Sequence, residues 1–152
     1  MYTIPAFQER LGTMLFTREF DYALRILRRL SAQKVVSIGN IVQCEHLTRA
    51  IAYKVARKLN RGGLIGSQRG TSGGYLLSRG LEEISLYDVF RVIEPETMIT
   101  ECMLDGYTCP MNNAEKPCSM HCAFVSIQER LFNELQQLSL EDILGGQHVP
   151  ED

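Results

Sequence analysis

The stretch from residue 48 to residue 78 decides the fold and reads TRAIAYKVARKLNRGGLIGSQRGTSGGYLLS. Its first part predicts a helix that Thr48 caps and that the glycine pair at 62–63 ends. The inward face of this helix carries only small or apolar residues, which are Ala52, Val55, Ala56 and Leu59. A short helix capped by Ser37 precedes it, with a turn near Glu45. A short helix, a turn and a basic helix form the pattern of a helix-turn-helix, whose second helix enters the major groove of DNA.

The second part of the stretch predicts a β-hairpin, the wing of a winged helix. Residues 64–68 and 75–78 are the expected strands, and the turn RGTSGG at 69–74 is rich in glycine, which tolerates positive φ. The guanidinium of Arg69 at the tip suits the minor groove or phosphates, because a narrow groove concentrates negative potential. A nucleotide-binding loop is not expected, since no Gly-x-x-x-x-Gly-Lys-Ser/Thr run is present.

Amphipathic patterns lie on both sides of this stretch. Apolar residues recur at helical spacing over residues 20–32, and the rest of that helix surface is expected to carry the basic residues Arg25, Arg28 and Arg29. A further short helix is expected from a cap at Ser85 to Glu94, before Pro95. The fold class is therefore mainly α with a small β-hairpin wing.

A single apolar stripe marks a long helix near the C-terminus. Its members step by three or four residues and are Phe124, Ile127, Leu131, Leu135 and Leu138. A lone stripe must be buried, either against the same helix of a second subunit, packed isologously, or against its own domain. Periodicity alone does not distinguish these two partners. A dimerisation helix is favoured because the helices of the basic half already form a core among themselves.

Charge is segregated along the 152 residues. The net charge is -2, but residues 14–80 carry +9 and residues 81–152 carry -11. A positive half attracts nucleic acid or anionic membrane, whereas an acidic half is repelled by both. On charge alone, two solvated surfaces without a partner are the alternative. No membrane span is expected, since none of the apolar runs approaches the ~18 to 20 residues required, and no signal peptide is recognisable, so we expect a cytoplasmic protein.

Four of the five cysteines lie in one short segment. They are spaced by six, eight and three residues, and their positions are Cys102, Cys109, Cys118 and Cys122. Without an export signal, stable disulfides are disfavoured, and thiolates suit iron-sulfur clusters and zinc. The absence of a Cys-x-x-Cys pair favours a cluster, while zinc and a thiol redox switch stay open. Cys44 is expected to be a small packing residue. No nucleophile-base pair or paired carboxylates are suggested, so an enzyme is not expected.

Several segments carry a resemblance to a known family. They are FTREFDYALRIL (16–27), KLNRGGLIGSQRGTSGGYLLSR (58–79), ISLYDVFRVIEP (84–95), the cysteine segment and LSLEDIL (138–144). The chain resembles the winged-helix regulators typified by the iron-sulfur cluster regulator IscR and the nitric oxide sensor NsrR. The resemblance implies a homodimer with long C-terminal helices crossed at the interface.

The resemblance also implies the ligands of an iron-sulfur cluster. Three would be Cys102, Cys109 and Cys118, and the fourth is where members differ. His121 follows Cys118 in the Cys-x-x-His arrangement of 2Fe-2S members, Asp21 of the other subunit matches the carboxylate of 4Fe-4S members, and Cys122 is a third candidate. The gap of eight residues before Cys118 is longer than usual in the family.

Helix phase predicts the residues that contact double-stranded DNA. They are Arg49, Tyr53, Lys54, Arg57 and Lys58 on the basic helix, with Arg69 and Gly70 on the wing. We expect a dimeric transcriptional regulator, either a repressor or an activator, on a pseudo-palindromic operator with half-sites about 34 Å apart. Cluster loss, oxidation or nitrosylation would change that spacing. The alternatives are a clusterless thiol or zinc regulator and a small iron-sulfur electron carrier.

The sequence thus predicts consecutive parts with distinct roles. They are an extension (1–13), a winged helix-turn-helix domain (14–95), a cysteine-rich cluster-binding loop (96–122), a dimerisation helix with a short terminal helix (123–144) and a tail (145–152).

Overall fold

A computed structural model describes residues 15–32, 34–113 and 115–145. The elements, in chain order, are α1 (Arg18–Ala32), α2 (Ile38–Cys44), α3 (Arg49–Arg61), β1 (Ile65–Gln68), β2 (Gly74–Leu77), η1 (Leu81–Glu83), α4 (Leu86–Ile93), η2 (Glu101–Met103), α5 (Ser119–Gln137) and α6 (Leu140–Leu144). This order confirms the predicted fold class, mainly helical with one hairpin. The predicted extension 1–13 and the tail beyond residue 145 lie outside the described residues.

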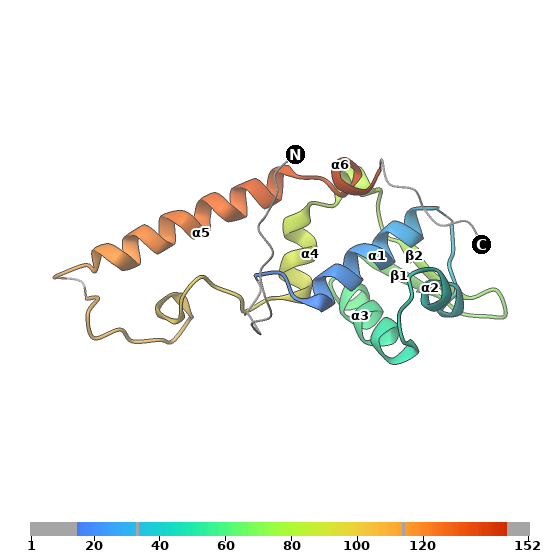
Figure 1. Ribbon diagram of the computed structural model, residues 1–152, viewed down its shortest axis with the longest axis horizontal. Coiled ribbons are helices and arrows are strands. Elements are labelled where there is room, and N and C mark those ends of the chain that lie inside the picture. Colours follow the sequence, from blue (N-terminus) through green and yellow to red (C-terminus); the bar gives the residue numbers. More distant parts are fainter. Residues whose placement is uncertain (1–14, 33, 114, 146–152) are drawn as a thin grey trace, which may run out of the picture.

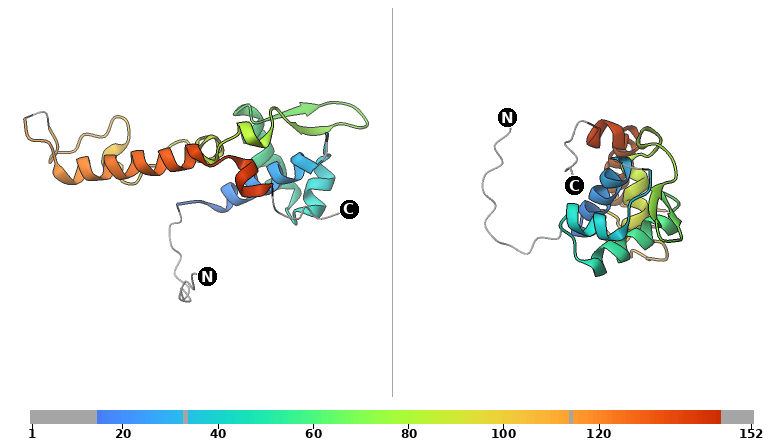
Figure 2. Two further views of the ribbon diagram at one scale, coloured as in Figure 1. Left: turned by 90° about the horizontal axis from the view of Figure 1, so that it is seen from above. Right: turned by 90° about the vertical axis from the view of Figure 1, so that its right-hand side faces the viewer.

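The molecule has a globular part and an arm (Figure 1). Helices α1 to α4 and the hairpin form the globular part, and α5 projects from it. The segment between α4 and α5, which holds the cysteines, runs beside α5 to its outer end. The wing and the outer end of α5 therefore lie at opposite ends of the molecule (Figure 2).

The core of the globular part forms where α1 packs across α3 and α4. Helix α3 begins and ends as predicted, and its four predicted inward residues are fully buried. The Thr48 hydroxyl oxygen accepts a hydrogen bond from the Ile51 N–H at 3.3 Å, and the Ser37 hydroxyl oxygen caps α2 in the same way. The helix-turn-helix is thus fixed by local capping together with burial of its small-residue face.

The surface expected for α1 is partly wrong. Arg29 is only 2% exposed, and its Nε donates to Asn40 Oδ1 at 2.7 Å. Arg28 pairs with Glu45, whose side chain is 1% exposed. Charges are buried in proteins only when they are paired and hydrogen-bonded, so both arginines join α1 to the α2 region instead of covering a solvated face. Only Arg25 lies as predicted, in an exposed pair with Asp21.

The wing is anchored to the helix-turn-helix through its second strand, β2. Strands β1 and β2 are antiparallel, with Ile65 opposite Leu77. Val36, just before α2, forms an isolated β-bridge with Tyr75 of β2. The Val36 N–H donates to the Tyr75 carbonyl oxygen at 2.9 Å, and the Tyr75 N–H donates to the Val36 carbonyl oxygen at 2.8 Å. The hairpin therefore projects from the helix-turn-helix in a fixed direction.

The apolar stripe predicted for α5 is only partly buried. Near the inner end, Leu135 is 5% exposed and Phe132 packs on Tyr87 and Phe90 of α4, but Leu138, the last predicted member, is the C-cap of α5 and is 41% exposed. The outer part of the stripe is exposed, with Phe124 at 37% and Ile127 at 47%. The helix also begins at Ser119, earlier than the predicted residue 123, so His121 and Cys122 lie in its first turn.

Candidate nucleic-acid interface and cysteine site

Helix α3 presents a groove of basic residues on the side away from the core. The residues that line it are Ala50, Tyr53, Lys54, Arg57, Lys58 and Arg61. They recur every three to four residues and so form one face of the helix. Arg49, Tyr53, Lys54 and Arg57 are exposed, as a DNA contact requires, and Lys58 is half-buried.

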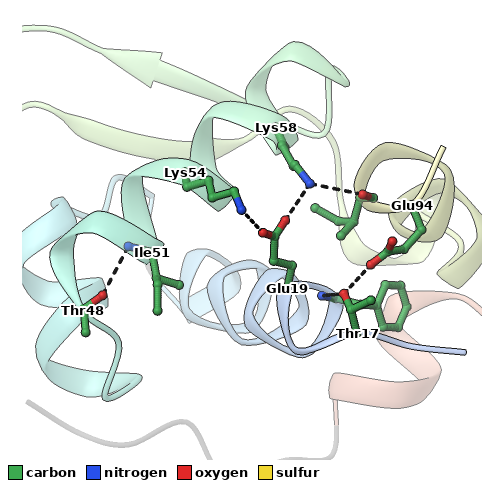
Figure 3. A network of polar contacts seen from close by, with 9 residues as sticks. Thr17, Glu19, Thr48, Ile51, Lys54, Lys58 and Glu94 are labelled. Carbon is green, nitrogen blue, oxygen red and sulfur yellow. Dashed lines mark hydrogen bonds and ion pairs between the residues drawn. The ribbon is translucent and has the colours of Figure 1, made fainter. Parts of the chain in front are cut away.

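The two lysines of this groove have an acidic neighbour in α1. The Glu19 carboxylate accepts hydrogen bonds from the ammonium groups of Lys54 and Lys58 (Figure 3). Lys58 also donates to the carbonyl oxygen of Ile93 at 3.3 Å, at the end of α4. The hydrogen bonds from Lys54 and then Lys58 lower the pKa of the Glu19 carboxyl below its ordinary value of 4.5. The carboxylate is therefore ionised at neutral pH.

A second hollow lies between α3 and the wing. Its lining combines Tyr53 of α3, the start of α2 and the wing residues 67–70 and 73–75. Arg69 and Gly70 are exposed at the wing turn, where Gly70 has a φ of 118° that L side chains rarely adopt. Burial, and then Tyr53, raise the pKa of the Tyr75 hydroxyl, which is therefore neutral at pH 7. The predicted helix and wing residues thus flank one continuous surface.

In the cysteine segment, the structure brings Cys102 and His121 together. Cys102 lies in η2 and His121 in the first turn of α5, and the Cys102 Sγ is 3.4 Å from the His121 Nδ1. Gln128, buried in α5 at 5% exposure, accepts a hydrogen bond from the Ile99 N–H at 2.9 Å. This bond fixes the start of the segment against the arm, and it places η2 beside the helix that carries His121.

A single asparagine connects the two other predicted thiol ligands. The Asn112 N–H donates to the Cys109 carbonyl oxygen at 3.1 Å, and the Asn112 side-chain oxygen accepts from the Cys118 N–H at 2.8 Å. The turn with Cys109 and the start of α5 are thereby joined through backbone groups. Nothing in the sequence singled out Asn112, Gln128 or Glu19, because their partners lie far away or in irregular chain.

Of the remaining ligand candidates, Cys122 is exposed in the first turn of α5 and Asp21 is paired with Arg25. Cys44, expected to be a packing residue and not a ligand, is half-buried at the end of α2. Across residues 15–32, 34–113 and 115–145, no three side chains of His, Cys, Asp or Glu are gathered closely enough to hold a metal ion. The five cysteines form no disulfide with one another in the described ranges.

Comparison with known proteins assigns this architecture to a family. The profile of the Rrf2 family, described as an iron-dependent transcriptional regulator, matches residues 16–146. The chain belongs to the Rrf2 family. It is 29% identical to protein aau3 of Rhizobium meliloti (strain 1021), over 86% of this chain and 85% of that protein. It is 28% identical to the HTH-type transcriptional regulator NsrR of Shouchella clausii (strain KSM-K16), over 86% and 89% of the two chains.

Solved structures place the Rrf2 chain in the same fold. CymR, the global cysteine regulator of B. subtilis, superposes with a TM-score of 0.69 over 90% of this chain and all of that one, at 20% identity. As an Rrf2 protein, the chain is a DNA-binding transcriptional regulator and not an enzyme. None of the helices in the described ranges combines the length and apolar character that a membrane crossing requires.

Proposed function

We propose that this Rrf2 protein is a homodimeric transcriptional regulator whose affinity for a pseudo-palindromic operator is controlled by an iron-sulfur cluster in residues 96–122. The contact between Cys102 and His121 carries the cluster part of this proposal, because it joins two predicted ligands that are 19 residues apart in the chain. The basic groove of α3 and the exposed wing turn support the DNA part. The family description, iron-dependent, agrees with both.

The donor set fits an iron-sulfur cluster. Cys102, Cys109 and Cys118 would supply thiolates, the soft ligands that iron-sulfur clusters require. We favour His121 as the fourth ligand over Cys122 and over Asp21 of the partner subunit, because the His121 Nδ1 lies 3.4 Å from the Cys102 Sγ. A bound cluster would supply a group sensitive to iron-sulfur status, redox state or nitric oxide. The chain's own residues hold the ligand turns in place through Asn112 and Gln128.

The outer part of α5 is the proposed dimer contact. Its exposed apolar residues are Met120, Phe124 and Ile127. Isologous packing of this face would bury it against itself in a second copy, next to both cysteine segments. A change in the cluster would then alter the packing of the arms and so the distance between the two α3 helices. DNA reads that distance, since half-sites lie about 34 Å apart.

Anaerobic purification tests the cluster. We expect a brown protein with iron and acid-labile sulfide, and loss of both in Cys102→Ala, Cys109→Ala and Cys118→Ala. His121→Ala should bind the cluster only in a labile form, whereas Cys122→Ala should retain the cluster as the wild type does. A colourless protein without iron would refute the assignment.

Gel shifts test the DNA surface with the same protein. A duplex selected from a random pool by the wild-type protein serves as the operator. We expect Arg69→Ala and Arg57→Ala to weaken operator binding at least tenfold, about 1.4 kcal/mol, because each removes a cation from the proposed surface. Unchanged binding by both variants would refute the surface. Light scattering of the free protein should give the mass of a dimer.

A clusterless thiol or zinc regulator is the second candidate. This candidate is favoured by the structural likeness to CymR, a cysteine regulator, and by the thiols of Cys102 and Cys122, which are not in disulfides. Metal analysis separates the candidates. Stoichiometric zinc, or metal-free protein whose operator binding changes reversibly on thiol oxidation, would support the second candidate and exclude the first.

A further inference from the structure

Glu19 lies outside the predicted DNA contacts but faces the recognition helix. It is in the first turn of α1, and its carboxylate lies between the ammonium groups of Lys54 and Lys58, the latter at 2.6 Å (Figure 3). The side chains of Glu19 and Lys58 are 26% and 36% exposed, and that of Lys54 is 63% exposed. The group is therefore at the protein surface, where phosphates would reach it.

The four cations of the α3 groove are not equivalent. Lys54 and Lys58 share the Glu19 carboxylate, so this trio carries +1 instead of +2. Arg57 and Arg61 are exposed, and in the described part of the chain neither has an ion pair. Lysine binds a phosphate as a point charge, whereas arginine also makes bidentate contacts with bases. The carboxylate thus weakens the positive charge of the two lysines of the groove and not that of its two arginines.

We propose that Glu19 is a specificity-determining residue, which holds Lys54 and Lys58 back from the phosphates of bulk DNA and leaves operator choice to the neighbouring arginines and Tyr53. This inference rests on the proposed DNA-binding function. Lys58 suits the role, because its second bond to the Ile93 carbonyl oxygen keeps its ammonium group beside Glu19. In this arrangement the carboxylate also repels any phosphate that approaches the trio.

The test compares Glu19→Gln with a variant of equal charge change. The control is Glu83→Gln, an exposed acid of η1, which packs on α6. Affinities of full-length, anaerobically purified protein for the selected operator and for a scrambled duplex are measured by fluorescence anisotropy between about 50 and 300 mM KCl. Each phosphate neutralised adds about 0.9 to the slope of log K against log salt.

We expect Glu19→Gln to steepen the slope on the scrambled duplex by about one and to raise that affinity roughly five- to tenfold at 0.1 M salt. The ratio of operator to scrambled affinity should fall several-fold, and Glu83→Gln should match the wild type. A slope equal to that of Glu83→Gln, or an unchanged affinity ratio, would overturn the proposal.

Folding does not limit this test. Exposed ion pairs contribute about 1 kcal/mol or less, so Glu19→Gln should fold, and Glu19→Met provides a second uncharged variant with the same expected slope. The salt titration of the wild-type protein distinguishes a failure of the proposed DNA-binding function from a failure of the proposed role of Glu19. If the wild type bound no duplex in a salt-dependent way, the DNA-binding function itself would fail. If the wild type bound DNA in a salt-dependent way but Glu19→Gln and Glu19→Met had the same slope and affinity ratio as the wild type, only the proposed role of Glu19 would fail.

Discussion

The close approach of Gly62 to Val92 makes the join between the recognition helix and α4 sensitive to one methyl group. A Cβ built on Gly62 would lie 2.3 Å and 2.7 Å from the two Val92 methyl carbons and 3.1 Å from the Val92 Cβ. Carbon atoms in contact are normally about 3.5 to 4.0 Å apart. Rotation of Val92 cannot relieve the overlap, because its Cβ is itself too near. Gly62 has a φ of -76°, which alanine adopts freely, so the cost of Gly62→Ala is steric.

Overpacking of this kind typically costs about 1 to 3 kcal/mol, and we expect Gly62→Ala to lower the free energy of unfolding by about 2 kcal/mol. Val92→Ala removes the two methyl groups and should cost about 1 kcal/mol alone. The double variant should be no less stable than Gly62→Ala, with a coupling energy of about 1 to 2 kcal/mol. Urea unfolding followed by circular dichroism measures all three. The steric overlap between a Cβ at position 62 and Val92 would be contradicted by strictly additive changes in the free energy of unfolding. A decrease under about 0.5 kcal/mol for Gly62→Ala would contradict it as well.

Three other substitutions or conditions give measurable effects. Glu45→Gln breaks the ion pair with Arg28 and should lower the free energy of unfolding by about 2 to 3 kcal/mol. This is less than expected for a fully buried pair, because the Arg28 side chain is 21% exposed. An unchanged urea midpoint would contradict the prediction. Gln128→Leu should speed hydrogen exchange at the Ile99 amide, which loses its acceptor, and exchange as slow as in the wild type would contradict it. The Glu19 pKa is depressed, so its ion pairs stabilise the fold above pH 4.5 and are lost as the pH falls through the lowered pKa. The stability difference between wild type and Glu19→Gln should therefore narrow in acid, and a difference constant with pH would contradict the assignment.

The helix-turn-helix could be predicted from sequence because its signals are local. Thr48 caps α3, the glycine pair ends it, and the small residues on one face are spaced by three or four. Each signal acts within one helical turn of the residue that it fixes. The hairpin is similar, since its turn residues and its strands are adjacent in the chain. Such features require no knowledge of the rest of the fold.

Features that depend on distant partners could not be predicted in the same way. Helix α5 began earlier than expected because its N-cap is Cys118, whose side chain makes no capping bond and gives no sequence signal. Arg29 was assigned to the surface, but its partner Asn40 is 11 residues away. The carboxylate of Glu19 meets lysines 35 and 39 residues later in the chain. Helical periodicity reports which face is apolar or charged, and it does not report what covers that face.

The attachments of α5 indicate how a change in the cysteine segment would reach DNA. At the inner end, the N–H groups of Leu86 and Leu140 bond the carbonyl oxygens of Leu138 and Ile84, both at 2.8 Å. These bonds and the buried packing of Phe132 make the inner end part of the winged-helix core. The outer end is instead held by the cysteine segment and carries exposed apolar residues. In the proposed dimer, each domain and the base of its arm are one packed unit. Altered contacts at the outer ends would therefore reposition the two domains relative to each other and leave the recognition helix unchanged within each domain.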